Sequence, residues 1–210
     1  LGKSVDISAN GQRVAVGAPF HSSNLAQRGH VRILEWSGTN WVDIGQDIRG
    51  QNQDDRFGYA VSLSNGGDWV AIGGTYNDNN GSNAGHVRVY QYDGQGWIKR
   101  GPDIDGEAAN DFSGYSVSLS SDGSIVAIGA TGNDGNGSNS GHVRIYKNDN
   151  GIWRQVGDDI DGEATGDKSG YSVSLSSDGS VVAIGANKND ENGSEHLRFK
   201  LKKPPKWPIW

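Results

Sequence analysis

The sequence contains no cysteine and no methionine, and only 5 of its 210 residues are proline. The lack of cysteine excludes disulfide bonds, thiol catalysis and zinc–thiolate sites. No apolar run approaches the roughly 20 residues that a membrane-spanning helix needs, so we expect no transmembrane segment in this chain. The formal net charge of −6 argues against a nucleic-acid partner, because nucleic acid requires a basic surface.

Glycine is abundant, with 33 residues, and the apolar residues occur in short clusters separated by Gly, Asn, Asp and Ser. This pattern is typical of many short strands joined by turns. No segment shows helical periodicity over a useful length, so the sequence predicts an all-β protein.

A 56-residue repeat organises the chain. The motif Gly-x-x-Val begins at Gly2, Gly58, Gly114 and Gly170, and three full periods contain no insertion or deletion. We place the repeats at about 2–57, 58–113, 114–169 and a truncated 170–199. Residues 200–210 form a basic tail, rich in Pro and Trp, that belongs to no repeat. We expect this tail to be either a docking segment for a membrane surface or partner, or a degenerate terminus.

The third repeat predicts four strands, at 115–119, 125–130, 142–146 and 153–160. Apolar residues alternate with serine in the first of them, while the second is continuously apolar and suits a strand covered on both faces. Tight turns are predicted at 121–124 and 148–151.

Four antiparallel strands per repeat are typical of a blade in a β-propeller. Because closed propellers have four to eight blades, we expect these repeats to form an incomplete or fragmentary ring. A blade needs neighbours to cover both faces. One tryptophan recurs in each complete repeat, and we predict these residues to anchor neighbouring blades: Trp41, Trp97 and Trp153.

The repeat resembles the FG-GAP repeat, which is best known from the propeller at the head of integrin alpha chains. The resemblance is carried by Phe57-Gly58, by Gly17-Ala18-Pro19 and by the stretch 126–146, and it covers residues 1 to about 199. It implies a propeller fold and a binding role at a cell surface.

A kelch-type propeller is the runner-up. Ile72-Gly73-Gly74, followed by Tyr90 and Trp97, is similar to the kelch double glycine with its later Tyr and Trp. The double glycine occurs once only, so the kelch pattern explains fewer positions than the FG-GAP pattern.

The integrin-type repeat often carries a calcium loop between its first two strands. The corresponding turns here, at 64–68, 120–124 and 176–180, contain one or two acidic residues each. Calcium takes six to eight oxygen ligands, so we do not expect calcium in these turns.

Longer loops should emerge together at the other end of the blades. One group comprises 77–82, 133–138 and 189–194, and the other contains Asp105 to Asp111 and Asp161 to Asp167. We expect this acidic loop face to be the functional surface, because loops on a rigid scaffold usually carry binding.

The first group of loops has two interpretations. Alternating Asp and Asn before Gly is similar to a calcium loop, whereas Asn- and Gly-rich turns also form because these residues tolerate left-handed backbone. Calcium is the only cofactor that the sequence indicates, with the candidate ligands Asp78, Asn80, Asp134, Asn136, Asp190 and Asn192. The Asn-x-Ser pattern also marks candidate glycosylation sites at Asn80, Asn136 and Asn192.

Other chemistry finds less support. His30, His86 and His142 occupy one position in successive repeats, so they should be spread around a ring and serve structural roles. The acid pairs at 105/107 and 161/163 repeat with the blade, unlike a catalytic pair. No nucleophile motif or phosphate loop is present.

The sequence therefore predicts a non-catalytic binding or adhesion scaffold, secreted or at the cell surface, that presents its acidic loop face to a protein or glycan. Two alternatives remain open: a fragment of a propeller enzyme acting on glycans or phospholipids, and a structural repeat spacer without a ligand.

Overall fold

The computed structural model describes residues 2–22, 27–189 and 198–202, with the last five as backbone only. All regular secondary structure in these residues is β, which confirms the predicted fold class. No helix in the described part of the chain is long and apolar enough to cross a membrane.

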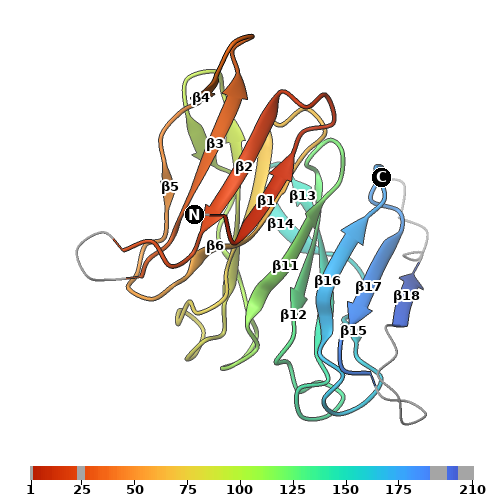
Figure 1. Ribbon diagram of the computed structural model, residues 1–210. Helices are drawn as coiled ribbons and strands as arrows, with labels where there is room; N and C mark the ends of the chain where they lie inside the picture. The colour runs from red at the N-terminus through yellow and green to blue at the C-terminus, as the bar shows by residue number, and fades with distance from the viewer. Residues whose placement is uncertain (1, 23–26, 190–197, 203–210) are drawn as a thin grey trace.

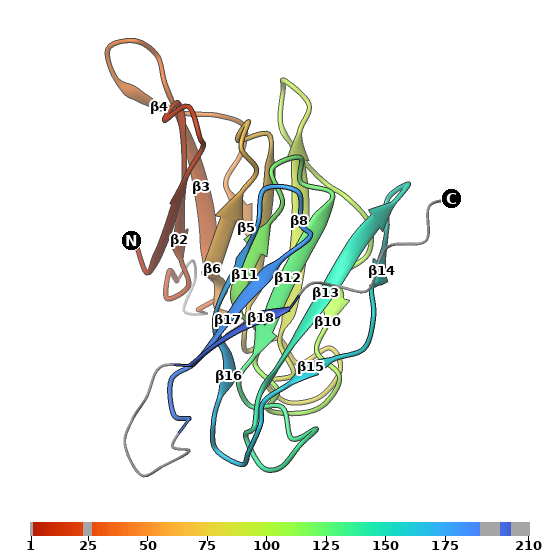
Figure 2. The ribbon, with the colours of Figure 1, turned by 90° about the vertical axis from the view of Figure 1, so that its right-hand side faces the viewer.

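The strands form four antiparallel sheets, which lie side by side and twist relative to one another (Figures 1 and 2). The first contains β1 (Ser4–Ile7), β2 (Arg13–Ala18), β3 (His30–Trp36) and β4 (Trp41–Asp43), with β5 (Ile48–Arg49) paired to β3. The second contains β6 (Phe57–Leu63), β7 (Trp69–Gly74), β8 (His86–Tyr92), β9 (Trp97–Lys99) and β10 (Ile104–Asp105). The third contains β11 (Ser113–Leu119), β12 (Ile125–Ala130), β13 (His142–Asp149), β14 (Ile152–Gln155) and β15 (Ile160–Asp161). The fourth contains β16 (Ser169–Leu175), β17 (Val182–Ala186) and β18 (Arg198–Lys202).

Neighbouring sheets contact each other through their first strands, β1, β6, β11 and β16, as blades of a propeller do. A line of backbone hydrogen bonds joins the sheets at one end. The amides of Ala9, Asn65 and Ser121 donate to Asn65 O, Ser121 O and Ser177 O, at 3.0, 3.0 and 2.8 Å. Each step spans 56 residues, so the sequence repeat is also the repeat of contacts between sheets.

Glycine permits the close approach of the sheets. A Cβ on Gly17 would lie 2.2 Å from Gly58 O, and one on Gly73 would lie 2.1 Å from Gly114 O. Gly58 itself has a φ of +89°, which favours glycine. The glycine of the Gly-Ala-Pro motif therefore packs against the glycine of Phe-Gly in the next repeat.

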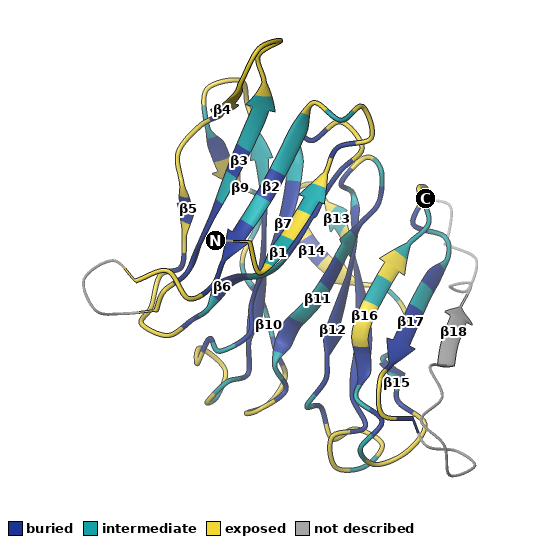
Figure 3. Ribbon diagram, in the orientation of Figure 1, coloured by how far each residue is buried: buried dark blue, intermediate teal, exposed yellow. Residues whose placement is uncertain are grey.

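The core lies between the sheets, and each apolar cluster draws on two neighbours. The middle sheets are buried on both faces, whereas β1 and β16 expose much of their surface (Figure 3). Trp97 is 3% exposed, and its indole N–H donates to Ile44 O of the first sheet at 3.0 Å. Trp153 donates in the same way to Arg100 O of the second sheet at 2.8 Å.

Trp41 behaves differently from the other two predicted anchors. It is 43% exposed and packs on Trp36 of its own sheet, with ring centroids 5.5 Å apart. No sheet precedes the first one in this structure, so Trp41 has no neighbour to anchor.

Two predicted elements of the third repeat are wrong in detail. The fourth strand, predicted at 153–160, is divided into β14 and β15, which pair with opposite ends of β13. Between them the chain turns through Gly157, whose φ is +71°. The third strand continues beyond residue 146 to Asp149, so the turn is confined to Asn150 and Gly151, both with positive φ.

The fourth sheet corrects the expected start of the tail. Residues 200–202 belong to β18, in which Arg198 pairs with Ala186 and Lys202 with Val182. In the third sheet Ala130 pairs with His142, so Arg198 continues the 56-residue register. The remainder of the predicted tail lies outside the described residues.

Candidate binding face

The loops predicted to emerge together do so, at the lower end of the sheets in Figure 1. We call this surface the loop face; it comprises residues 50–56, 75–85, 106–112, 131–141 and 162–168. Backbone hydrogen bonds tie the loops to one another: the Asn110 amide donates to Ser82 O at 2.8 Å, and the Gly166 amide to Ser138 O at 2.9 Å. The loop face is therefore a hydrogen-bonded surface shared by adjacent sheets.

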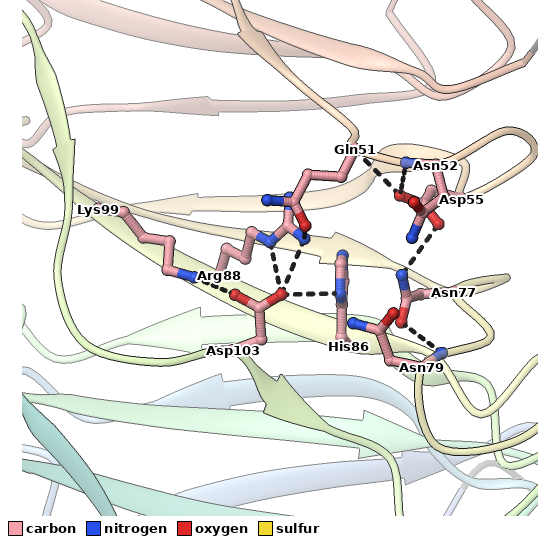
Figure 4. Close-up of polar contacts among 9 residues, drawn as sticks. All are labelled: Gln51, Asn52, Asp55, Asn77, Asn79, His86, Arg88, Lys99 and Asp103. Atoms are coloured by element: carbon pink, nitrogen blue, oxygen red, sulfur yellow. Dashed lines mark hydrogen bonds and ion pairs between the residues drawn. The ribbon is translucent and has the colours of Figure 1, made fainter.

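A buried aspartate fixes each connection between sheets. Asp55 is 1% exposed; it accepts hydrogen bonds from the Asn52 amide at 2.8 Å and from the Asn77 side chain at 2.9 Å (Figure 4). Asp111 and Asp167, expected among the oxygen ligands of the loop face, occupy the same buried position. Because their oxygens hold the loops together, they are structural residues and do not line the surface.

The candidate calcium ligands that the structure describes form hydrogen bonds within the loop face. Asp78 accepts from the Asn83 amide at 2.7 Å, and Asp134 accepts from the Asn139 amide at 2.7 Å. Both partners have a positive φ, as expected of Asn in tight turns. These bonds account for the acidic residue in the loop without a metal, and calcium binding here stays a prediction.

The amides of the candidate glycosylation sites hold adjacent loops together. The Asn80 side chain donates to Gly106 O at 2.7 Å and to Glu107 O at 3.1 Å. Asn136 donates equivalently to the carbonyls of residues 162 and 163. A glycan on either nitrogen would have to disrupt these bonds, and glycosylation stays a prediction. Asp190 and Asn192 lie outside the described residues.

The turns at the opposite end do not fit the integrin-type calcium loop. Each of the last two contains one carboxylate, and its oxygens accept hydrogen bonds from serine. Hydrogen bonds from Ser176 and Ser180 lower the pKa of Asp178 to about 2. The same residue types surround Asp122, and they lower its pKa against the effect of partial burial.

A buried histidine lies at each boundary where one sheet meets the loop that leads into it. We call the boundary of the first and second sheets junction 1 (Figure 4). His86 is 0% exposed, and its Nδ1 lies 3.5 Å from Asp103 Oδ2. Arg88 donates to the same carboxylate at 2.8 Å, and Lys99 pairs with its other oxygen. Burial, and then the Arg88 charge, lower the pKa of His86 to about 3, so this imidazole is neutral at pH 7.

Junction 2, between the second and third sheets, has the same framework with different charges. His142 is 1% exposed, and its Nδ1 lies 3.5 Å from Asp159 Oδ2. Arg144 lies 3.2 Å from Glu107 Oε1, and Asp159 accepts from the Gln155 amide at 2.6 Å. Burial raises the pKa of Glu107; Arg144 opposes this shift and the Asp159 carboxylate adds to it.

The sequence analysis compared the histidines only with one another, and so missed these clusters. The histidines do not converge, but each meets an aspartate 17 residues further along its own sheet. The 56-residue register contains this signal, since Asp47, Asp103 and Asp159 occupy one repeat position.

A row of aromatic residues also escaped the sequence analysis. Tyr59, Tyr115 and Tyr171, the third residues of β6, β11 and β16, have neighbouring ring centroids 5.1 and 5.2 Å apart. Lys3 continues the row, with its ammonium 4.6 Å from the Tyr59 ring. Burial, followed by the adjacent tyrosine hydroxyls, raises the pKa of Tyr115. This tyrosine row lies where the first strand of each sheet leaves the loop face.

A second aromatic cluster lies on the loop face itself. Arg56 stacks between Phe20 and Tyr76, at 5.4 and 3.6 Å from the ring centroids. Tyr76 in turn packs on Phe112 at 5.5 Å. Phe20 is 53% exposed and borders a hollow of about 390 Å³ that is also lined by Lys3 and His21. Aromatic rings and acidic loops therefore share one end of the molecule.

The comparison with protein families agrees with this architecture. The FG-GAP repeat profile matches residues 50–90 and 104–146. The chain carries FG-GAP repeats. The first matched segment includes Phe57-Gly58 and both segments span parts of two sheets. No curated protein sequence matches the chain.

Several solved structures share the fold of these FG-GAP repeats. Hydrazine synthase of Kuenenia stuttgartiensis has a TM-score of 0.57 at 14% identity, over 96% of this chain and 46% of that one. The periplasmic gluconolactonase PpgL of Pseudomonas aeruginosa has a TM-score of 0.57 at 17% identity, over 95% and 56%. Sqt1 of Chaetomium thermophilum, solved with the N-terminus of ribosomal protein L10, has a TM-score of 0.55 at 17% identity, over 86% and 40%. The chain thus spans about half the length of these structures, and the likeness concerns the fold alone.

Proposed function

We propose that these FG-GAP repeats form a non-catalytic binding scaffold, secreted or at a cell surface, whose loop face and tyrosine row hold a glycan or protein partner. The tyrosine row carries this proposal: three half-exposed aromatic side chains, one from each of three successive sheets, lie in contact at the edge of the loop face. Tyrosine combines a large apolar ring with a polar hydroxyl, which suits it to interfaces.

The rigidity of the loop face supports the same function. Buried carboxylates at Asp55, Asp111 and Asp167 fix the loops, so the exposed groups are held in place before a partner arrives. A pre-organised surface loses less conformational entropy on binding than a mobile one.

A binding screen with the 210-residue chain tests the proposal. We expect binding to members of a glycan array or to proteins of the extracellular matrix. Combined Tyr59→Ala and Tyr171→Ala substitutions should weaken the Kd at least about tenfold, since truncating an interface tyrosine commonly costs more than 1 kcal/mol. Trp36→Ala, which removes an exposed aromatic group at the opposite end, should leave the Kd unchanged. Equal Kd values for both variants would exclude the tyrosine row.

A propeller enzyme acting on glycans or phospholipids is the second candidate. Junction 2 favours it, because Glu107 and Gln155 depart from the residues at the equivalent positions of junction 1, as a reacting site would. The gluconolactonase among the structural neighbours makes lactones a sensible first substrate to test. Turnover of gluconolactone, a glycoside or a phospholipid that is lost in Glu107→Gln would replace the non-catalytic assignment.

A further inference from the structure

The three histidine positions differ in how their charges are balanced. In the first sheet, Arg32 and Arg49 face two carboxylates, Asp43 and Asp47. In junction 1, Arg88 and Lys99 face Asp103 and the adjacent Asp105. Cations and carboxylates are equal in number at both places, so each cluster has a formal charge of zero.

Junction 2 lacks this balance. Three carboxylates, from Glu107, Asp159 and Asp161, lie around His142 and face a single cation, Arg144. Two substitutions between the repeats cause the difference: Gln51 is replaced by Glu107, and Lys99 is replaced by Gln155. Two negative charges are therefore not neutralised by protein groups in this cluster.

The geometry of junction 2 suits a small cation. The ligand atoms of Glu107, His142 and Asp159 all lie within 4.8 Å of one another. The 3.5 Å between His142 Nδ1 and Asp159 Oδ2 is close to the separation of two ligands around a tetrahedral zinc ion, about 3.3–3.6 Å for metal–ligand distances of 2.0–2.2 Å. Asp161 Oδ1 lies 4.0 Å from the same nitrogen.

His142 is a second, independent indication of a ligand. Its side chain is almost completely buried, yet neither ring nitrogen has a hydrogen-bond partner among the described residues. Buried polar atoms are nearly always paired, so an orphaned imidazole that faces carboxylates needs an explanation. Burial lowers its pKa, which keeps the imidazole in the neutral form that ligates metals.

We propose that junction 2 binds a divalent transition-metal cation, such as Zn²⁺, through Glu107, His142 and Asp159, with Asp161 beside them. A mixed nitrogen and carboxylate set suits Zn²⁺ better than Ca²⁺ or Mg²⁺, which prefer oxygen alone. In junction 1 the Lys99 ammonium, paired with Asp103, is the built-in counterpart of this cation. The metal site is separate from the tyrosine row, so it does not depend on the proposed binding function.

Isothermal titration of the metal-free 210-residue chain with Zn²⁺ tests the site. We expect one equivalent to bind with a micromolar or lower Kd. Gln155→Lys restores the residue type found in junction 1, and it should raise the Kd at least tenfold. Because Gln155 is exposed, this variant should fold, which circular dichroism will verify. Asp149→Asn, at an exposed acid elsewhere in the same sheet, should not change the Kd.

The reverse exchange gives a gain of binding. Lys99→Gln combined with Gln51→Glu reproduces the charges of junction 2 in junction 1, and should raise the stoichiometry from one Zn²⁺ to two. Absence of stoichiometric Zn²⁺ binding to the parent chain, or an unchanged Kd in Gln155→Lys, would overturn the proposal. Tighter binding of Ca²⁺ or Mg²⁺ than of Zn²⁺ would overturn the choice of metal.

Discussion

The first and second sheets carry similar residues at equivalent positions, but only the second has a sheet on both sides. Val5 and Ile7 of β1 are 66% and 57% exposed, whereas their equivalents, Val61 and Leu63 of β6, are 8% and 7% exposed. The strands themselves pair in a similar manner. Burial of a side chain in this architecture is therefore decided by the adjacent sheet, and each sheet is stabilised by contacts outside itself.

Removing a tryptophan should show the largest effect of this difference. Trp97→Ala deletes a side chain that fills the boundary between two sheets and donates to Ile44 O, so we expect a loss of about 3–5 kcal/mol in the free energy of unfolding. Trp41→Ala, at the equivalent exposed position, should cost less than 1 kcal/mol. Urea unfolding followed by circular dichroism measures both, and similar losses would contradict the role of the neighbouring sheet.

Truncation of the first strands should give a smaller effect in the same direction. Leu63→Ala removes a buried side chain, and buried leucines typically lose about 2–5 kcal/mol on this change. Ile7→Ala alters an exposed residue and should change stability by no more than about 0.5 kcal/mol. The two urea midpoints would coincide only if β1 were as well covered as β6.

Acidification should distinguish the buried histidines by a smaller amount. His86 faces Arg88, Lys99, Asp103 and Asp105, and its pKa of about 3 is well below the value of about 6.5 in the unfolded chain. The unfolded state therefore binds the proton first. Its contribution to stability is complete above pH 6.5 and decreases as the pH falls toward 3, by about 1.4 kcal/mol at pH 5.5.

Unfolding free energies measured between pH 7.5 and 5 check this assignment. His86→Gln should lower stability at pH 7.5 but remove about that much of the pH dependence. Burial and His21 also lower the pKa of His30, in the less covered first sheet. We expect a smaller change of slope in His30→Gln, and an unaltered slope in His86→Gln would show that another group titrates.

The sequence predicts the repeated architecture well, because its evidence is periodic. The register of 56 residues locates the sheets, and alternation with serine locates strands such as β11. The division of the predicted fourth strand into β14 and β15 could not be read from its apolar residues. It depends on the left-handed turn at Gly157 and on a pairing of β15 with the start of β13, which is a contact distant in sequence.

The site was predicted only in outline, for a similar reason. Acidic residues in loops gave the correct end of the molecule, but composition could not separate buried carboxylates such as Asp111 from exposed ones such as Asp134. Both are followed by polar or turn residues in the sequence. Only the packing of one loop against the next shows which oxygens are already engaged.

The glycine contacts between sheets have a consequence for how such repeats evolve. Gly17, Gly73 and Gly129 meet the carbonyl oxygen of a glycine in the next sheet, so main chain alone sets the spacing at these points. The pitch from one blade to the next, and hence the curvature of the arc, is insensitive to the side chains on the loops. Neighbouring junctions can therefore diverge in charge, as residues 99 and 155 have done, without a change in the geometry of the scaffold.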